Sequence, residues 1–254
     1  MIISVLVNVG LVMLLLLSSI GDAHADDLKV FSTPTLKSAL VELAPRFEWE
    51  TGHRLAATYD NAATLKRRIE AGEAFDVAIL LPAQVDDLIR TGKLVSSTRV
   101  DVAKATVGMA MRADAPAPNI GTVDAFRRAL TSVRSLSWSP ESASGAYLVG
   151  LLGRLGFTDT VKPHLVPVTG GDVVAAVAGG QADATVITVP NIVDAPGVQL
   201  VGLLPHELQH DTIYTAGIAT HTADPRGAKA LIDFLQSAKA TAVLRKKGLE
   251  QPTP

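Results

Sequence analysis

The sequence predicts an α/β protein of two lobes, each with a mainly parallel sheet flanked by helices, with a ligand cleft between the lobes. Short apolar runs alternate with helical apolar patterns along the chain, and this alternation is typical of parallel strands covered by helices. The alternation occurs as two series, separated by the proline-containing loop 113–119. We expect lobe 1 to comprise residues 26–108 and 212–254, and lobe 2 to comprise residues 109–211.

Residues 1–25 have the features of an export signal. The run 5–20 is almost wholly apolar, and Ala23-His24-Ala25 fits a small-x-small cleavage site. We therefore expect a periplasmic protein that is cleaved after Ala25. A retained membrane anchor is the alternative interpretation, because no Lys or Arg precedes the apolar run and its length approaches that of a membrane span.

Composition excludes several classes of protein. The chain has 254 residues, a formal net charge of −2 and no cysteine. A near-neutral charge does not suit nonspecific nucleic-acid binding, which needs a basic stripe. The missing cysteines exclude a disulfide framework, a thiolate nucleophile and a cysteine-based metal site. We expect a globular exported protein with no cofactor and no nucleic-acid partner.

The first series opens with a short strand that begins at Leu28 and leads into a turn and a helix. Leucines at 36, 40 and 43 and Phe47 recur on one face of a 3.6-residue period. Pro34 suits the first helical turn, and we expect Thr33 or Thr35 to cap it. Further expected elements are strands at 54–59, 75–81, 107–111 and 212–219, and helices that begin after residues 60–61, 82 and 224–225.

The second series repeats this organisation. Thr122 is expected to cap a helix that runs through Leu130, and the loop 139–145 leads into a helix with four inward leucines. Residues 170–172 open another helix at 173–178. The expected strands are 136–138, 165–168, 184–189 and 198–203.

Both series place a hydroxyl-rich turn between a strand and a helix N-terminus, at 32–35 and at 139–145. Helix N-termini leave N–H groups unpaired, and ligands of doubly wound sheets bind at the carboxyl ends of strands. A single such turn is more simply a cap or a turn. Two matched turns favour anion capture between the lobes. The hydroxyls expected to contribute belong to Ser32, Thr33, Thr35, Ser142 and Ser144.

Several fragments resemble periplasmic solute-binding proteins of the molybdate-binding type, which deliver ligands to ABC importers. Their order and spacing cover nearly all of the chain after residue 25. The fragments are 30–36 (VFSTPTL), 69–77 (IEAGEAFDV), 139–145 (SPESASG), 197–205 (GVQLVGLLP), 228–235 (AKALIDFL) and 247–249 (KGL). The resemblance implies a type II periplasmic binding fold with a hinge between the lobes, an ABC permease in the inner membrane as partner, and a small anionic ligand. We also expect a monomer.

The resemblance also implies ligand residues. Thr35 occupies the position of a family hydroxyl, and Ala62, with Asn61 beside it, stands where the family has a serine. Backbone N–H groups are expected from Ser144 and Gly145. Gly171, Asp172 and Val173, at the start of a second helix, are also expected to bind the ligand. Thr188 falls where molybdate binders supply a tyrosine. Because Ala62 and Thr188 depart from the family pattern, three ligands stay as alternatives: molybdate, another oxyanion and a carboxylate.

Asp172 has two possible roles. As an N-cap it would satisfy helix N–H groups, whereas pointing into the cleft its charge would repel an anion. Asp60 carries the same ambiguity.

Two other functions are considered as alternatives to anion binding. The first is isomerisation of a tricarboxylate, because aconitate isomerase is similar to this family; no His–carboxylate pair in the turns supports it. The second is a zinc peptidase, because residues 206–210 (HELQH) match H-E-x-x-H. Only a few residues separate this motif from a β-branched run, and the extended form would need glycine and histidine at Ile213 and Ala216. A binding protein without catalytic or metal-ligating residues is therefore the favoured interpretation.

Overall fold

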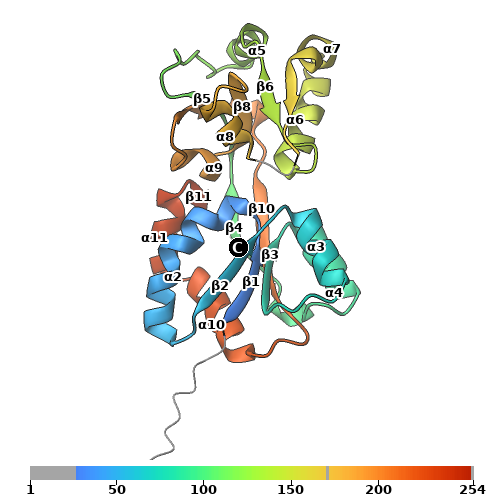
Figure 1. Ribbon diagram of the computed structural model, residues 1–254, viewed down its shortest axis with the longest axis vertical. Coiled ribbons are helices and arrows are strands. Elements are labelled where there is room, and N and C mark those ends of the chain that lie inside the picture. Colours follow the sequence, from blue (N-terminus) through green and yellow to red (C-terminus); the bar gives the residue numbers. More distant parts are fainter. Residues whose placement is uncertain (1–26, 170–171, 253–254) are drawn as a thin grey trace, which may run out of the picture.

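A computed structural model describes residues 27–169 and 172–252 of the chain. The expected export signal and Gly171 lie outside the described residues. The described part forms two lobes stacked along the long axis of the molecule, each built around one sheet (Figure 1). The expected two-lobed α/β fold is thus confirmed.

Lobe 1 contains a six-stranded sheet with the strand order β11-β4-β10-β3-β1-β2. Its strands are β1 (Leu28–Ser32), β2 (Leu55–Tyr59), β3 (Val77–Leu80), β4 (Val100–Ala105), β10 (Thr212–Ile218) and β11 (Leu249–Glu250). Its helical elements are the 3-10 turns η1 (Pro34–Leu36) and η2 (Ser96–Thr98) and the helices α2 (Lys37–Thr51), α3 (Ala62–Glu70), α4 (Pro82–Arg90), α10 (Pro225–Leu235) and α11 (Ala238–Lys246).

Lobe 2 contains a five-stranded sheet with the strand order β7-β6-β8-β5-β9. Its strands are β5 (Val107–Arg112), β6 (Leu136–Trp138), β7 (Leu165–Pro167), β8 (Ala184–Thr188) and β9 (Val198–Leu203). Its helical elements are α5 (Val123–Ser132), α6 (Ala143–Arg154), α7 (Thr158–Val161), η3 (Lys162–His164), α8 (Val173–Ala178) and α9 (Pro190–Val193); η4 (His206–Leu208) lies on the way back to lobe 1.

Both sheets are mixed rather than mainly parallel. β1 pairs in parallel with β2 and β3, and β6 pairs in parallel with β7 and β8. β10 runs antiparallel to β3 and β4, and β5 runs antiparallel to β8 and β9. β5 and β10 adjoin the two connections between the lobes. They therefore run antiparallel to their neighbours, whereas βα alternation alone predicts parallel strands.

Alternating side chains explain why helices cover both faces of the first sheet. In β1, Val30 packs with α2 and α10, whereas Phe31 points to the opposite face and joins the core beneath α3 and α4. Val77 and Ala78 in β3 divide in the same way. Successive side chains of a strand point to opposite faces, so each apolar strand serves two cores. Figure 1 shows α2, α10 and α11 on one side of this sheet and α3 and α4 on the other.

The short helix α9 brings lobe 2 into contact with lobe 1. The Asn191 amide donates to the Thr35 hydroxyl at 3.2 Å, and Lys247 in lobe 1 donates to Asp194 at 2.6 Å. Gly248 packs so closely that an added Cβ would lie 2.8 Å from Val189. These contacts hold α9 of lobe 2 against η1 and against the segment that follows α11 in lobe 1.

Candidate ligand site between the lobes

The carboxyl ends of the parallel strands face each other across the two lobes. In lobe 1, the Thr33 N–H bonds to Ile79 and the Asp60 N–H bonds to Ser32, so the ends of β1, β2 and β3 share one edge. In lobe 2, the Val168 N–H bonds to Trp138, which places the turns after β6 and β7 together. The end of β8 lies at the same edge and contacts η1 through Asn191 and Thr35. This is the position where α/β sheets hold ligands.

Four polar side chains meet at this edge. We call Thr35, Thr188, Asn191 and Tyr214 the Thr35 cluster. Tyr214 donates its hydroxyl to Thr35 at 3.0 Å, and the Asn191 amide nitrogen donates to Thr188 at 2.7 Å and to Thr35 at 3.2 Å. Thr35, Thr188 and Tyr214 are buried. Two of the expected ligand residues, Thr35 and Thr188, are thereby linked across the lobes.

Tyr214 supplies a phenol on the strand that passes between the lobes. A register shift between Tyr214 and Thr215 interrupts the pairing of β10 with β4, and such bulges re-aim side chains. Burial raises the pKa of Tyr214 to about 12, although hydrogen bonds with the hydroxyls of Thr35 and Thr188 act in the opposite direction. The phenol therefore keeps its proton at neutral pH and remains available as a donor.

The first hydroxyl turn lies beside this cluster. Ser32 ends β1 and donates to the Thr33 carbonyl at 3.3 Å. Thr33 is 6% exposed, and its hydroxyl has no hydrogen-bond partner among the described residues. The expected capping role was wrong for both threonines, because Thr33 makes no side-chain cap bond at η1 and Thr35 lies within that turn. The turn therefore keeps one buried hydroxyl without a hydrogen-bond partner in the described part of the chain.

The turn after β2 contains the next two expected residues. Asn61 caps α3 by accepting from the Thr64 N–H at 2.8 Å, and Ala62 begins that helix with its side chain buried. Asp60 accepts from the Asn61 N–H at 2.7 Å. The Asp60 carboxylate is thus engaged with its own turn.

The second hydroxyl turn is held together by its own hydrogen bonds. The Ser142 hydroxyl donates to the Ser139 carbonyl at 3.1 Å and accepts from the Gly145 N–H at 3.0 Å, which caps α6. The Gly145 N–H that we expected at the ligand is therefore used within the turn. An added Cβ at Gly145 would lie 1.8 Å from the Ser139 carbonyl oxygen, so only glycine permits this approach. Ser144, in the first turn of α6, is half-buried.

The helix α8 begins at the third expected position. Asp172 accepts from the N–H groups of Val174 at 2.8 Å and Ala175 at 3.2 Å, so its carboxylate acts as the N-cap. Val173 is buried, and its carbonyl accepts from the Ser137 hydroxyl at 2.9 Å. Of the two roles considered for Asp172, the structure has the capping one.

The H-E-x-x-H match has no helix to support it. Residues His206–Leu208 form the single 3-10 turn η4, and Gln209 is extended. Two histidines separated by four positions share a face only on an α-helix. Across residues 27–169 and 172–252, no group of three or more His, Asp or Glu side chains is placed to hold a metal ion.

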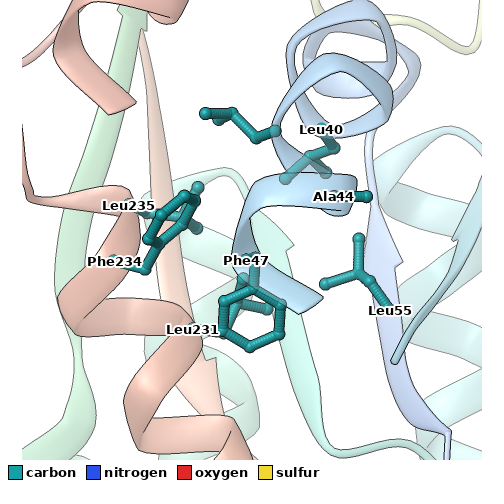
Figure 2. Close-up of a pocket in the computed structure, with 8 residues that line it drawn as sticks. Leu40, Ala44, Phe47, Leu55, Leu231, Phe234 and Leu235 are labelled. Atoms are coloured by element: carbon teal, nitrogen blue, oxygen red, sulfur yellow. The ribbon is translucent and has the colours of Figure 1, made fainter. Parts of the chain in front are cut away.

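An apolar hollow in lobe 1 is separate from the polar edge. It lies between α2, α10 and β2, and Figure 2 shows its side chains converging without a polar atom among them. Its lining is Leu40, Leu43, Ala44, Phe47, Leu55, Leu231, Phe234 and Leu235. The hollow has no space for a water molecule, so it belongs to the packed core.

Sequence comparison matches residues 28–250 to a family described as bacterial extracellular solute-binding protein. The match covers both sheets and every residue of the Thr35 cluster. The chain belongs to this family. Within residues 27–169 and 172–252, no helix of this solute-binding protein has the length and apolar character that membrane crossing demands.

Three known proteins show how far the similarity extends. Aconitate isomerase from Pseudomonas sp is 30% identical over 235 residues, which is 89% of this chain and 88% of that protein. Molybdate-binding protein ModA of Escherichia coli (strain K12) is 26% identical over 90% of this chain and 91% of its own length. The solved periplasmic molybdate-binding protein of Azotobacter vinelandii has a TM-score of 0.77 at 20% identity, covering 89% of this chain and 100% of that one. The expected resemblance to molybdate-binding solute-binding proteins is therefore confirmed.

Sequence reasoning missed two members of the Thr35 cluster. Asn191 follows Pro190 in α9, three residues after β8 ends at Thr188, and a polar side chain just beyond a strand end was the available signal. Tyr214 lies inside the run 212–215, which we interpreted only as a β-branched strand. Both contact Thr35 from more than 150 positions away, so no local pattern reveals these contacts.

Proposed function

We propose that this solute-binding protein captures a small anion between its lobes, an oxyanion or an organic carboxylate, and presents it to an ABC permease in the inner membrane. The supporting observation is the Thr33 hydroxyl, which is buried at the edge facing lobe 2 without a partner among the described residues. A buried polar group without a partner is destabilising. A bound anion would accept this hydrogen bond.

The Thr35 cluster adds a second argument for binding. Its side chains are hydroxyls and an amide, and none is a carboxylate. Such groups can donate to an anion without repelling it. The ligand residues expected from the sequence, from Ser32 to Thr188, remain part of this proposal, except that the Gly145 N–H is engaged by Ser142.

A thermal-shift panel tests the proposal. The protein beginning at Asp26 is heated with molybdate, tungstate, sulfate, phosphate, citrate, cis-aconitate or trans-aconitate. A ligand at 100 times its Kd adds about 2.7 kcal/mol, which raises the Tm of a chain of this size by roughly 5–10 °C. A panel without any shift would overturn anion binding.

A pair of matched variants locates the binding site. Thr33→Val removes the free hydroxyl, and Thr131→Val makes the same change on the exposed surface of α5. A hydrogen bond to a charged partner contributes about 1.5–3 kcal/mol, so Thr33→Val should weaken binding roughly ten- to a hundredfold. Thr131→Val should leave Kd unchanged. Equal affinities in both variants would remove Thr33 from the site.

Isomerisation of a tricarboxylate is the second candidate, and the similarity to aconitate isomerase favours it. Moving a double bond along a carbon chain requires a group that takes up a proton. The phenol of Tyr214, with its raised pKa, is a poor base at neutral pH. NMR of cis-aconitate with the protein in D2O decides the question: trans-aconitate signals would establish the enzyme, and unchanged spectra with a Tm shift would support binding alone.

We also propose export with cleavage after Ala25, and a monomeric state. Mass spectrometry of the periplasmic fraction should give a protein beginning at Asp26. Light scattering should give the mass of one chain. A membrane-bound form of full length would instead establish a retained anchor.

A further inference from the structure

Lys247 lies where lobe 1 meets the end of α9 in lobe 2 (Figure 1). Its ammonium nitrogen is 2.6 Å from a carboxylate oxygen of Asp194 and 2.9 Å from one of Glu42. Asp194 caps the C-terminus of α9, whereas Glu42 belongs to α2 in lobe 1. The Lys247 side chain is only 11% exposed. One of its two ion pairs therefore lies within lobe 1, and the other joins the lobes in a largely buried position.

The two ion pairs respond differently to a separation of the lobes. If α9 left lobe 1, Lys247 would keep its pair with Glu42, which also pairs with Lys246 at 2.8 Å. Asp194 is already 47% exposed and would become fully hydrated. A buried charge that loses its only partner is strongly destabilising. The pair between the lobes can thus break without leaving such a charge.

Gly248, the next residue, allows the close approach of α9. Its φ of +75° lies in the left-handed region, which favours glycine. An added Cβ would lie 2.8 Å from the Val189 side chain and 3.4 Å from that of Val193. A side chain at this position would therefore push α9 away from lobe 1. The close contact at Gly248 and the ion pair at Lys247 hold the same helix.

The same helix carries the lobe 2 part of the Thr35 cluster. Asn191 lies within α9, three positions before Asp194, and its amide donates to Thr35 at 3.2 Å. α9 thus contacts lobe 1 at the polar edge through Asn191 and at the segment after α11 through Asp194. A helix held at two points has less freedom to shift than a helix held at one. The position of Asn191 against Thr35 therefore depends on the contact at Lys247.

We propose that Lys247 and Asp194 are positioning residues that set anion affinity by holding α9 against lobe 1. This inference rests on the proposed function. A ligand that contacts both lobes binds best when the lobes are held in the arrangement that brings their polar edges together. Its Kd rises as the population of that arrangement falls. Breaking the ion pair should therefore weaken binding without removing any group that touches the ligand.

Asp194→Asn is the decisive variant. Isothermal titration calorimetry with the protein beginning at Asp26 gives Kd for sulfate, molybdate and cis-aconitate. For each anion that binds, we expect Kd to rise about two- to fivefold, which corresponds to the loss of one partly exposed ion pair. Removal of a negative charge would by itself favour an anion. A weaker affinity therefore cannot be a long-range effect of the lost charge.

Two controls accompany this variant. Asp159→Asn makes the same change at an exposed position of α7 in lobe 2 and should not raise Kd. Asp194→Glu keeps a carboxylate that can reach Lys247 and should retain the affinity. The ratio of the Kd values of Asp194→Asn and the unmodified protein should approach one at about 0.5 M NaCl, because salt screens a partly exposed pair.

A double-mutant cycle tests whether the two residues act together. Once Lys247→Met has removed the ammonium group, Asp194→Asn should cause no further rise in Kd. The cycle is measured in the same titrations. Losses that multiply in the double variant would show that the two residues act independently and would overturn the proposed pair.

A matched pair of glycine variants tests the close contact beside the ion pair. Gly248 and Gly52 each follow a helix with nearly the same φ, +75° and +77°, so alanine introduces similar backbone strain at both. An added Cβ at Gly52 meets nothing within 4 Å. Both variants should lower Tm, but only Gly248→Ala should also raise Kd, by about fivefold or more. Equal Kd values in the two variants would contradict the inference; if Gly248→Ala does not fold, the Asp194 variants decide.

Hydrogen exchange of the ligand-free protein gives a readout that does not depend on the anion. Residues 188–194 should exchange faster in Asp194→Asn than in the unmodified protein or in Asp159→Asn, because α9 is held less firmly. Unchanged Kd values in Asp194→Asn, with or without faster exchange, would overturn the inference and leave anion binding intact. No binding of any panel anion to the unmodified protein would instead overturn the proposed function, and this inference with it.

Discussion

The side-chain amide of Gln209 pairs with both backbone groups of Val107. Its oxygen accepts from the Val107 N–H at 3.1 Å, and its nitrogen donates to the Val107 carbonyl at 2.8 Å. The same nitrogen donates to the Leu204 carbonyl at 3.2 Å. Val107 begins β5 just after the chain leaves lobe 1, and Gln209 precedes its return. One side chain therefore ties together the two connections between the lobes.

Gln209→Ala is expected to destabilise the protein. It leaves the Val107 N–H without its partner, whereas the Val107 carbonyl still accepts from the Leu204 N–H at 3.2 Å. An unsatisfied buried group costs about 1–3 kcal/mol. Urea unfolding measures the change. The control is Gln181→Ala, because Gln181 is exposed after α8 and such changes stay within about 0.5 kcal/mol. Similar midpoints for both variants would show that the amide link does not stabilise the fold.

Gly145→Ala should disrupt the second hydroxyl turn. The added methyl group would overlap the Ser139 carbonyl oxygen, and overpacking of this kind costs about 1–3 kcal/mol. The Ser142 cap would be displaced with it, so anion affinity should also fall if the turn contributes to the site. Differential scanning calorimetry and calorimetric titration give the two values.

Gly150→Ala is the matched control on the same helix. An added Cβ at Gly150 meets nothing within 4 Å, and alanine favours a helix over glycine by about 0.5–1 kcal/mol. This variant should therefore raise Tm. A fall in Tm at both positions would mean that α6 does not tolerate alanine for reasons unrelated to the Ser139 contact.

Two substitutions at Asp172 separate its role as a helix cap from the effect of its negative charge. Asp172→Ala removes the acceptor of two N–H groups, and loss of an N-cap costs about 0.5–2 kcal/mol. Asp172→Asn keeps an acceptor, so its free energy of unfolding should stay close to that of the unmodified protein. It also removes a negative charge beside the proposed site, which should tighten anion binding. Unchanged affinity in Asp172→Asn would place the carboxylate too far away to affect the ligand.

Tyr214 predicts a loss of stability in alkaline solution. Its pKa rises from 10.0 to about 12 in the folded protein, because burial disfavours the phenolate. Its contribution is complete below pH 10 and is lost as the pH rises to 12, by roughly 2.7 kcal/mol in total. Urea unfolding at pH 9 and pH 11 measures the slope. Burial also raises the pKa of Tyr59 and Tyr147, so Tyr214→Phe should flatten the slope only in part, and an identical slope would contradict the prediction.

Local patterns were sufficient to predict most helices and strands. The helix at 173–178 and the strand at 198–203 were predicted with the bounds that the structure has. The helix is bounded by the capping Asp172 and by Gly179, and the strand begins after Gly197 and ends two residues before Pro205. Local signals therefore lie at or close to these boundaries. β4 was missed, because Asp101 and Lys104 interrupt its short apolar alternation.

The candidate site was less accessible to sequence reasoning. Thr35 was identified as a hydroxyl at a helix start, but its partners depend on how two lobes and a returning strand meet. Tyr214 is 179 positions from Thr35, and its approach depends on a bulge and a strand order that composition does not encode. Contacts between residues so far apart in the sequence depend on tertiary packing, which local propensity and residue spacing do not determine.

The position of β10 has a consequence for how the chain acquires its structure. In the first sheet β4 lies between β10 and β11, and both of these strands follow lobe 2 in the chain. A growing or translocating chain therefore contains β4 long before it contains either of its neighbours. Contacts between segments so far apart form slowly. Lobe 2 is continuous in sequence and can reach its native pairing first, so completion of lobe 1 should be the late step in folding, and the first sheet should be the last part to gain protection from hydrogen exchange during refolding.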